Sequence, residues 1–320
     1  RAARLRALSR RCRGRRAAAP RLAALTARPQ MLAIIAGVLT SLAFASSTLT
    51  SARASRLAGP TPVVAGVMLV GLIIVSPIAL LASPVPADPA ITPMTFVFSA
   101  LGGAANITGL LLIYAGLRIG TIGVVSTIAS TEGAIAAVVS VVAGQALAAG
   151  AGLVLALIAF GVVLAATDRG EALEGDVRIP RAQALRSAGF AAAAATIFGL
   201  GLFATGEASV LLPPAWVIFP GRIIGVVALT VPLWLTGRLR VPRAAVPLVV
   251  MTGITEVVGF SLYAIGARSD IALTAVLSSM FAPMAAVAAF ILFRERLARI
   301  QIIGIAIVVV GVATLGWLSA

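Results

Sequence analysis

The strongest constraint on the fold is a series of ten apolar runs, each long enough to cross a lipid bilayer. A membrane-spanning helix needs about 20 mostly apolar residues, and the chain is 60% hydrophobic but only 11% charged. The predicted spans are 31–50, 62–83, 94–116, 120–142, 147–167, 187–209, 214–236, 244–266, 270–292 and 299–318. Short loops join most of them. We therefore predict an all-α membrane protein with ten transmembrane helices.

The chain also repeats itself at a distance of 150 residues. This shift runs without a gap through the last three helices of each half. It aligns Gly103 with Gly253, Gly109 with Gly259, Gly116 with Gly266, Arg118 with Arg268, Leu147 with Leu297 and Gly161 with Gly311. A shift of 155 residues aligns Pro77 with Pro232 in the second helix of each half. Aligned glycines and arginines at a fixed spacing indicate an internal repeat.

Each repeat holds five helices, and this odd number gives the two halves opposite orientations in the membrane. Inverted repeats build many secondary transporters, in which the substrate site lies near the bilayer midplane between the halves. We therefore predict two inverted five-helix repeats around a central cavity. The predicted division is a basic flexible N-terminal tail at 1–30, a first repeat at 31–167, a charged linker at 168–186 and a second repeat at 187–320.

The basic residues lie mainly in the tail and at the ends of the predicted helices. The net charge is +15, all 25 basic residues are arginine, and ten of them lie between Arg1 and Arg28. A basic chain can bind nucleic acid, but aromatic residues do not interleave with these charges. Membrane topology and lipid head groups explain the arginines better. We therefore expect no nucleic-acid partner.

Ten helices place both termini on the same side of the membrane, which we expect to be the cell (plasma) membrane. The arginine-rich tail indicates that this side is cytoplasmic, because translocating the tail is difficult. The loops indicate the opposite, because 13 other arginines lie on the far side and only Arg268 lies with the termini. We predict cytoplasmic termini, and the loop arginines contradict this orientation.

The sequence holds none of the residue sets that are typical of soluble enzymes. It has no histidine and one cysteine, Cys12, which excludes a disulfide within the chain and a Cys/His zinc site. A Walker loop for nucleotide phosphates is missing, and so is histidine, the most common general base. We therefore expect neither an enzyme nor a bound cofactor or metal.

Two carboxyl groups fall at the centres of predicted helices, namely Glu132 and Glu256. An ionisable group at a helix centre costs about 2.5–3.5 kcal/mol to insert, so each needs a reason. A carboxyl group that gains and loses a proton suits a proton-coupled exchanger, and a carboxylate also suits a cationic substrate. Alternatively, either group could be a protonated acid that bonds a neighbouring helix, or could form a salt bridge with Arg222.

Asn106, Arg222 and Tyr263 complete the predicted substrate-binding set. The shift of 150 residues pairs Asn106 with Glu256, so both would face one cavity near the midplane. Arg222 could bind a carboxylate or phosphate through its planar guanidinium group, or it could extend to the membrane interface. Tyr263 is a candidate cavity aromatic, although interfacial belts explain membrane aromatics more often.

The last two predicted helices carry a distinctive set of polar and proline residues. They read Ser278-Ser279-Met280-Phe281-Ala282-Pro283, then Phe293-Arg294-Glu295-Arg296-Leu297, then Gln301, Gly304 and Gly311. This pattern resembles EamA-type transporters of the drug/metabolite transporter superfamily, and the resemblance covers residues 31–318. It implies two five-helix repeats and transport of amino acids, metabolites, drugs or nucleotide-linked sugars.

The two repeats resemble this family unequally. In the second repeat, Arg222 resembles the family's arginine near the start of the second helix. In the first repeat, Gly133 stands where the proline would be, Gln145 where the glutamate would be, and Val67 where Arg222 would be. The first repeat is therefore the divergent one.

We expect a secondary transporter that exports small metabolites, amino acids or drugs by alternating access, with proton coupling as one option. Its partners would be a small-molecule substrate and the lipid bilayer, and a homodimer is compatible with the sequence. Two other hypotheses stay open. One is a flippase for a lipid or lipid-linked sugar, and the other is a non-transporting membrane scaffold or enzyme.

Overall fold

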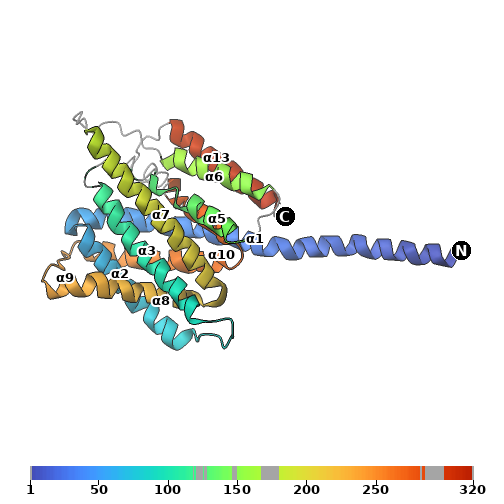
Figure 1. Ribbon diagram of the computed structural model, residues 1–320, viewed down its shortest axis with the longest axis horizontal. Helices are drawn as coiled ribbons and strands as arrows, with labels where there is room; N and C mark the ends of the chain where they lie inside the picture. The colour runs from blue at the N-terminus through green and yellow to red at the C-terminus, as the bar shows by residue number, and fades with distance from the viewer. Residues whose placement is uncertain are drawn as a thin grey trace.

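A computed structural model describes residues 2–117, 119, 125, 128–145, 150–166, 180–281, 283–284 and 299–318. Side chains are described from residue 30 onward, apart from residues 117, 165–166, 301, 312–313 and 315–318. Every regular element within these ranges is a helix (Figure 1). The predicted all-α class is therefore confirmed.

The helix bounds follow the predicted spans. The first half contains α1 (Ala2–Ala58), α2 (Pro60–Pro77), the π-helical segment η1 (Ile78–Ala82), α3 (Pro93–Leu117), α5 (Glu132–Val142) and α6 (Ala151–Ala166). The second half contains α7 (Arg181–Leu211), α8 (Pro214–Gly225), the π-helical segment η2 (Val226–Thr230), α9 (Val231–Leu235), α10 (Val246–Ala267), α11 (Ile271–Ser278) and α13 (Arg299–Leu318). Within the described residues, six helical segments are long and apolar enough to span a membrane, and α5, α6 and α13 add shorter apolar stretches.

Prolines set several helix starts. Pro60 and Pro214 occupy the first positions of α2 and α8, where the fixed φ suits the first turn and the missing N–H has no helical partner to lose. α7 begins at Arg181, directly after Pro180, so this helix starts inside the stretch predicted as a charged linker. The linker residues up to 179 lie outside the described residues. α1 includes residues 2–29 as an extension that leaves the bundle (Figure 1), and the flexibility expected of the tail stays a prediction.

The two halves pack around an approximate twofold axis. α1 packs along α10 and α3 packs along α7, and these two contacts are the most extensive. The repeat relates α1 to α7 and α3 to α10, so the twofold rotation places the α1–α10 contact on the α7–α3 contact. α6 packs on α13, α5 on α11 and α2 on α8, so each of these helices meets its own counterpart; Figure 1 shows α6 and α13 side by side. This is the pattern that inverted repeats require.

Glycines aligned by the shift of 150 residues make matching contacts in the two halves. A Cβ atom added to Gly109 would lie 2.6 Å from Cε1 of Phe198, and one added to Gly259 would lie 2.5 Å from Cε1 of Phe44. In the last helix pair, Gly161 contacts Val308 and Gly311 contacts Ile158. Small residues let membrane helices approach closely, so the aligned glycines mark the closest helix crossings.

The second helices of the two halves pair in a register that differs from the predicted one. Gly66 lies against Val249, and the matching contact joins Val217 to Ser99, whose hydroxyl donates to the Val217 carbonyl at 2.7 Å. Residues 66 and 217 are 151 positions apart, so the counterpart of Arg222 is Gly71. The predicted match with Val67 is wrong because Pro77 precedes η1 whereas Pro232 follows η2, so the two prolines are not equivalent.

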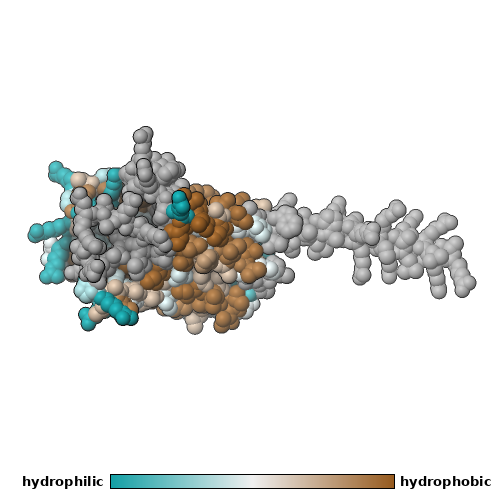
Figure 2. Space-filling model, turned by 90° about the horizontal axis from the view of Figure 1, so that it is seen from above, coloured by the Kyte–Doolittle hydropathy of each residue, from teal (hydrophilic) through white to brown (hydrophobic). Residues whose placement is uncertain are grey.

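Polar and apolar surfaces are separated along the length of the bundle. Figure 2 shows an apolar surface beside the α1 extension and hydrophilic side chains gathered at the opposite end. The ends of the α1, α7 and α9–α10 segments place exposed arginines there, namely Arg53, Arg56, Arg181, Arg186, Arg238, Arg240 and Arg243. α13 ends on the side from which the α1 extension leaves (Figure 1). The arrangement is that of a multi-pass membrane protein, and the side that faces the cytoplasm stays a prediction.

Candidate functional site

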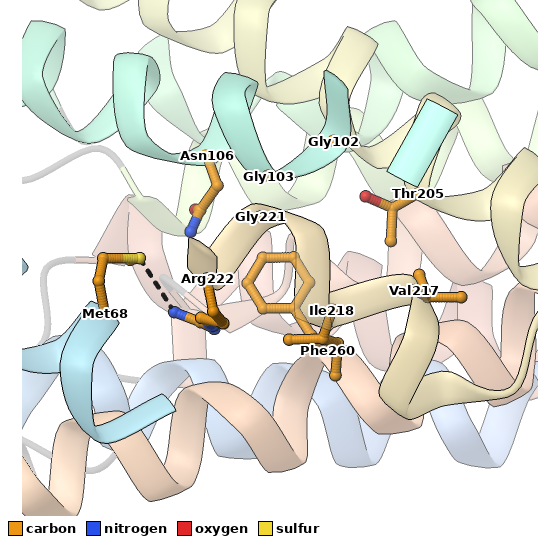
Figure 3. Close-up of a pocket in the computed structure, with 10 residues that line it drawn as sticks. All are labelled: Met68, Gly102, Gly103, Asn106, Thr205, Val217, Ile218, Gly221, Arg222 and Phe260. Atoms are coloured by element: carbon orange, nitrogen blue, oxygen red, sulfur yellow. Dashed lines mark hydrogen bonds between the residues drawn. The ribbon is translucent and has the colours of Figure 1, made fainter. Parts of the chain in front are cut away.

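A small cavity lies between the two halves, at the crossing of α2, α3, α7, α8 and α10. Its volume is about 20 Å³, which is room for about one water molecule. The lining residues, drawn in Figure 3, are Met68, Gly102, Gly103, Asn106, Thr205, Val217, Ile218, Gly221, Arg222 and Phe260. Both repeats contribute to this wall, as a substrate site between inverted repeats requires.

Two glycines bring α3 and α8 into backbone contact beside the cavity. A Cβ atom added to Gly103 would overlap the Cα atom of Gly221, and one added to Gly221 would lie 2.6 Å from the Cα atom of Gly103. No residue larger than glycine fits at either position without moving a helix. The pair therefore closes the cavity tightly and holds the neighbouring Arg222 and Asn106 at the same level.

Arg222 and Glu256 form a buried ion pair at the cavity. The guanidinium Nη1 donates to Oε2 of Glu256 at 2.5 Å, and only 3% of Arg222 and 8% of Glu256 are exposed. The same Nη1 lies 3.3 Å from the sulfur of Met68, and the guanidinium carbon lies 5.7 Å from the centre of the Phe260 ring. Arg222 therefore does not extend to the membrane interface, and Glu256 takes the salt bridge that its sequence position allowed.

Asn106 shares this cavity with Arg222. Figure 3 shows its amide pointing from α3 toward Arg222 on α8. Asn106 lines the cavity beside Arg222, and Glu256 binds the same arginine. Three of the five predicted site residues thus meet in one place.

Tyr263 lies outside the cavity wall. It is fully buried, and its hydroxyl donates to the carbonyl of Leu202 on α7 at 2.8 Å. Its ring packs with Ala136 and Ala275 in a separate apolar cluster. The geometry thus fits a side chain that joins α10 to α7, and it does not place Tyr263 at the cavity.

Glu132 occupies a second place, at the first position of α5. Its side chain is buried, with 8% exposed, and its carbonyl oxygen packs against Gly199 on α7. The described residues supply no hydrogen bond and no ion pair to its carboxyl group. The two carboxyl groups singled out in the sequence therefore have different surroundings.

Comparison with known families decides what this arrangement resembles. Residues 185–317 match the EamA-like transporter family. The matched segment is 133 of the 320 residues and lies in the second half of the chain, which is therefore similar to EamA-like transporters. It begins near the start of α7 and ends within α13, so it includes Arg222, Glu256 and Tyr263.

A solved structure described as "Crystal structure of protein" resembles the whole fold. The TM-score is 0.67 at 18% sequence identity, and the match covers 88% of this chain and 95% of the other. At this identity the likeness establishes the fold alone, and the match extends over both halves of the chain. A search of curated proteins finds no match.

Thr205 and Met68 line the cavity but were absent from the predicted site. The repeat carries no signal for Thr205, because the matching contacts of Phe44 and Phe198 lie 154 positions apart and pair Thr205 with Ser51. Thr205 packs against Gly102. Met68 carried no signal either, because an apolar residue in an apolar helix is indistinguishable from its neighbours.

Proposed function

We propose that this protein is a secondary transporter that exports a small polar metabolite through the space between its two halves. The observation that carries the proposal is the buried ion pair of Arg222 and Glu256 at the cavity. A buried ion pair often stabilises a protein less than apolar residues of similar volume would. The pair lies between the two repeats, next to the glycine contact of α3 and α8. Because stability alone does not explain an ion pair buried there, its position supports a role in binding.

The chemistry of the pair favours a zwitterionic or carboxylate cargo. Arg222 offers a planar donor to a carboxylate, and Glu256 offers an acceptor to an ammonium group. An amino acid would satisfy both, so that two ion pairs replace one while the cargo is bound. Asn106 and Thr205 add neutral hydrogen-bonding groups to the same wall.

Transport requires this wall to open. A cavity of about 20 Å³ holds no amino acid, so the halves must separate on one side of the membrane at a time. Alternating access by rocking of inverted repeats provides such a motion. The glycine contact of α3 and α8 provides a crossing with no side chains to interlock, about which the halves can move.

The direct test is exchange by the purified full chain in proteoliposomes. Vesicles are loaded with one unlabelled solute from a panel of L-amino acids and small carboxylates, and uptake of the labelled solute is measured. We expect exchange of at least one solute with a carboxylate group. Failure of every solute to exchange, with correctly folded protein, would contradict the proposal, and scrambling of labelled phospholipid would support a flippase instead.

Matched threonine variants on α7 link the activity to the cavity. Thr205→Val removes a hydroxyl at the cavity wall, whereas Thr196→Val removes an exposed hydroxyl that donates to the Ala192 carbonyl. Losing one hydrogen bond to cargo costs about 1–2 kcal/mol, so Thr205→Val should lower exchange roughly tenfold. Thr196→Val should exchange like the wild type, and equal rates in both variants would remove the cavity from the pathway.

A further inference from the structure

The helix that carries Arg222 loses one of its own hydrogen bonds just before that residue. Pro220 lies inside α8 and has no N–H group, so the carbonyl of Trp216, four residues earlier, receives no helical hydrogen bond from it. Backbone carbonyls away from water nearly always have a partner, and within a bilayer only the protein can supply one. Another group must therefore satisfy this carbonyl.

Ser99 on α3 supplies the partner from the other half of the chain. Its side chain is buried, with 1% exposed. Its hydroxyl lies 3.2 Å from the carbonyl oxygen of Trp216 and 2.7 Å from that of Val217, and it donates between the two. Moving α8 by one residue would carry each carbonyl about 1.5 Å along the axis and about 100° around it. The hydroxyl therefore fixes both the height and the rotation of α8 on α3.

The same face of α3 meets α8 at two further levels. Gly103, one turn after Ser99, contacts the backbone of Gly221, and Asn106 follows beside Arg222 at the cavity (Figure 3). Residues spaced by three and four lie on one face of a helix. The glycine contact brings the helices close but has no side chains to prevent sliding. Ser99 adds the directional bond that the glycines lack.

The first turn of α8 has a second attachment to the other half. The indole N–H of Trp216 donates to the carbonyl of Ser83 at 2.8 Å, and the indole ring packs edge-on against Phe96 of α3. These contacts hold the start of α8 in place without the Ser99 hydroxyl. A variant without this hydroxyl should therefore fold, with α8 less firmly fixed on α3.

The twofold-related crossing of α2 with α10 lacks the polar contact. The apolar Val249 packs there against Gly66, in place of Ser99 and its acceptor. That crossing also has a leucine in place of the proline and a glycine in place of the arginine, at Leu69 and Gly71. The hydroxyl contact thus occurs at the crossing that carries the arginine and is missing at its copy. This links it to the arginine rather than to helix packing in general.

We infer that Ser99 is a positioning residue, whose hydroxyl sets the register of α8 so that the guanidinium group of Arg222 meets the carboxylate of Glu256. That charge-assisted bond, 2.5 Å long, is specific in its geometry. Arg222 follows Val217 by less than two helical turns, so a rotation of this part of α8 reaches it directly. The consequence for cargo affinity rests on the proposed function, whereas the effect on the ion pair can be measured without transport.

Denaturation of the full chain in detergent micelles tests the effect on the ion pair. Arg222→Met is introduced into the wild type, into Ser99→Ala and into Ser187→Ala. Ser187 on α7 is the matched control, because it is equally buried and its hydroxyl donates to the Gly116 carbonyl of the other half at 3.1 Å.

The measured quantity is the drop in unfolding midpoint that Arg222→Met causes in each background. This drop should be roughly halved in Ser99→Ala, because a pair that is already weakened has less to lose. It should keep its full size in Ser187→Ala. Equal drops in all three backgrounds would overturn the inference.

Pro220→Ala separates positioning of the arginine from mere satisfaction of a carbonyl. Alanine supplies the N–H that proline lacks, so Ser99→Ala combined with Pro220→Ala should recover stability, and it also serves if Ser99→Ala alone does not fold. The drop caused by Arg222→Met should stay small in this combination, because the new bond lies within α8 and does not reach α3. A drop of full size would mean that Ser99 only satisfies the carbonyl, and the inference would fall.

The exchange assay extends the test to the cargo. Ser99→Ala should raise the KM for the exchanged solute several-fold and leave the maximal rate unchanged, because the arginine is displaced but the halves still move. Ser187→Ala should keep the KM of the wild type. An unchanged KM in Ser99→Ala would contradict the role in cargo affinity. A wild type that exchanges nothing would contradict the proposed function instead, and the denaturation series would then decide on Ser99 by itself.

Discussion

Glu256 and Glu132 are both buried at helix crossings between the halves, but their surroundings differ in charge balance. At the α2–α8 crossing, Arg222 reaches Glu256 and the pair is neutral as a unit. At the α5–α11 crossing, the described residues bring no cation to Glu132. The first carboxylate can stay ionised while buried because the charge of Arg222 balances it, whereas no positive group of the described residues balances the charge of Glu132.

The sharpest way to break this comparison is to remove the arginine. Arg222→Met leaves Glu256 buried without its partner and should lower the free energy of unfolding by about 3–5 kcal/mol. Adding Glu256→Gln removes the second charge and should restore most of the loss. Denaturation in detergent micelles measures both, with the exposed Arg243→Met as control. A double variant as unstable as the single one would mean that the pair does not act as a unit.

The glycines at the two crossings should differ in tolerance. A Cβ atom at Gly133 would overlap the backbone carbonyl of Ala275, whereas one at Gly71 would lie 2.9 Å from the flexible side chain of Arg222. Gly133→Ala should therefore cost about 3 kcal/mol and Gly71→Ala about 1 kcal/mol. The same denaturation assay ranks them, with Gly189→Ala as a control because nothing lies within 4 Å of that position. The reverse order would show that Arg222 is held more rigidly than the α11 backbone.

Away from the two crossings on the axis, the halves should respond alike. Phe198 covers Gly109 in the same way that Phe44 covers Gly259. Gly109→Ala and Gly259→Ala should each lower the free energy of unfolding by about 1–2 kcal/mol, because a ring can turn where a backbone cannot. Melting of the two variants side by side checks this. If the two losses of unfolding free energy differed by more than either loss itself, the repeats would have diverged in their helix packing as well as in their buried charges.

The smallest effect is expected at Glu132. Glu132→Gln keeps the volume and the polarity of a protonated carboxyl group, so the free energy of unfolding should change by less than about 1 kcal/mol. Glu256→Gln, by contrast, leaves Arg222 unpaired and should behave like Arg222→Met. Comparing the two glutamine variants in one denaturation series is the measurement. Equal destabilisation would show that Glu132 has a partner after all.

Much of the fold could be predicted from the sequence, because apolar run length and glycine alignment act directly on helices in a bilayer. The same repeat paired Asn106 with Glu256, whereas Arg222 was singled out by its own charge within a predicted helix. The start of α5 at Glu132, inside the predicted span 120–142, could not be foreseen, since residues like Ser130 and Thr131 also occur in unbroken membrane helices. The register of α2 relative to α8 was predicted wrongly because Pro77 and Pro232 align at a shift of 155 residues although they lie on opposite sides of their π-helical segments. Tyr263 lies outside the described cavity wall, and an aromatic residue in a helix carries no sign of the face it occupies.

The position of Gly71 beneath Arg222 also bears on how such a molecule can arise. Residues related by 151 positions meet each other on the twofold axis, so two identical halves would bring a side chain against its own copy. Two guanidinium groups at this point would repel each other at close range. An arginine on the axis is therefore compatible only with a partner half that differs from it. Joining both halves in one polypeptide permits that difference, and a symmetric assembly of single repeats does not.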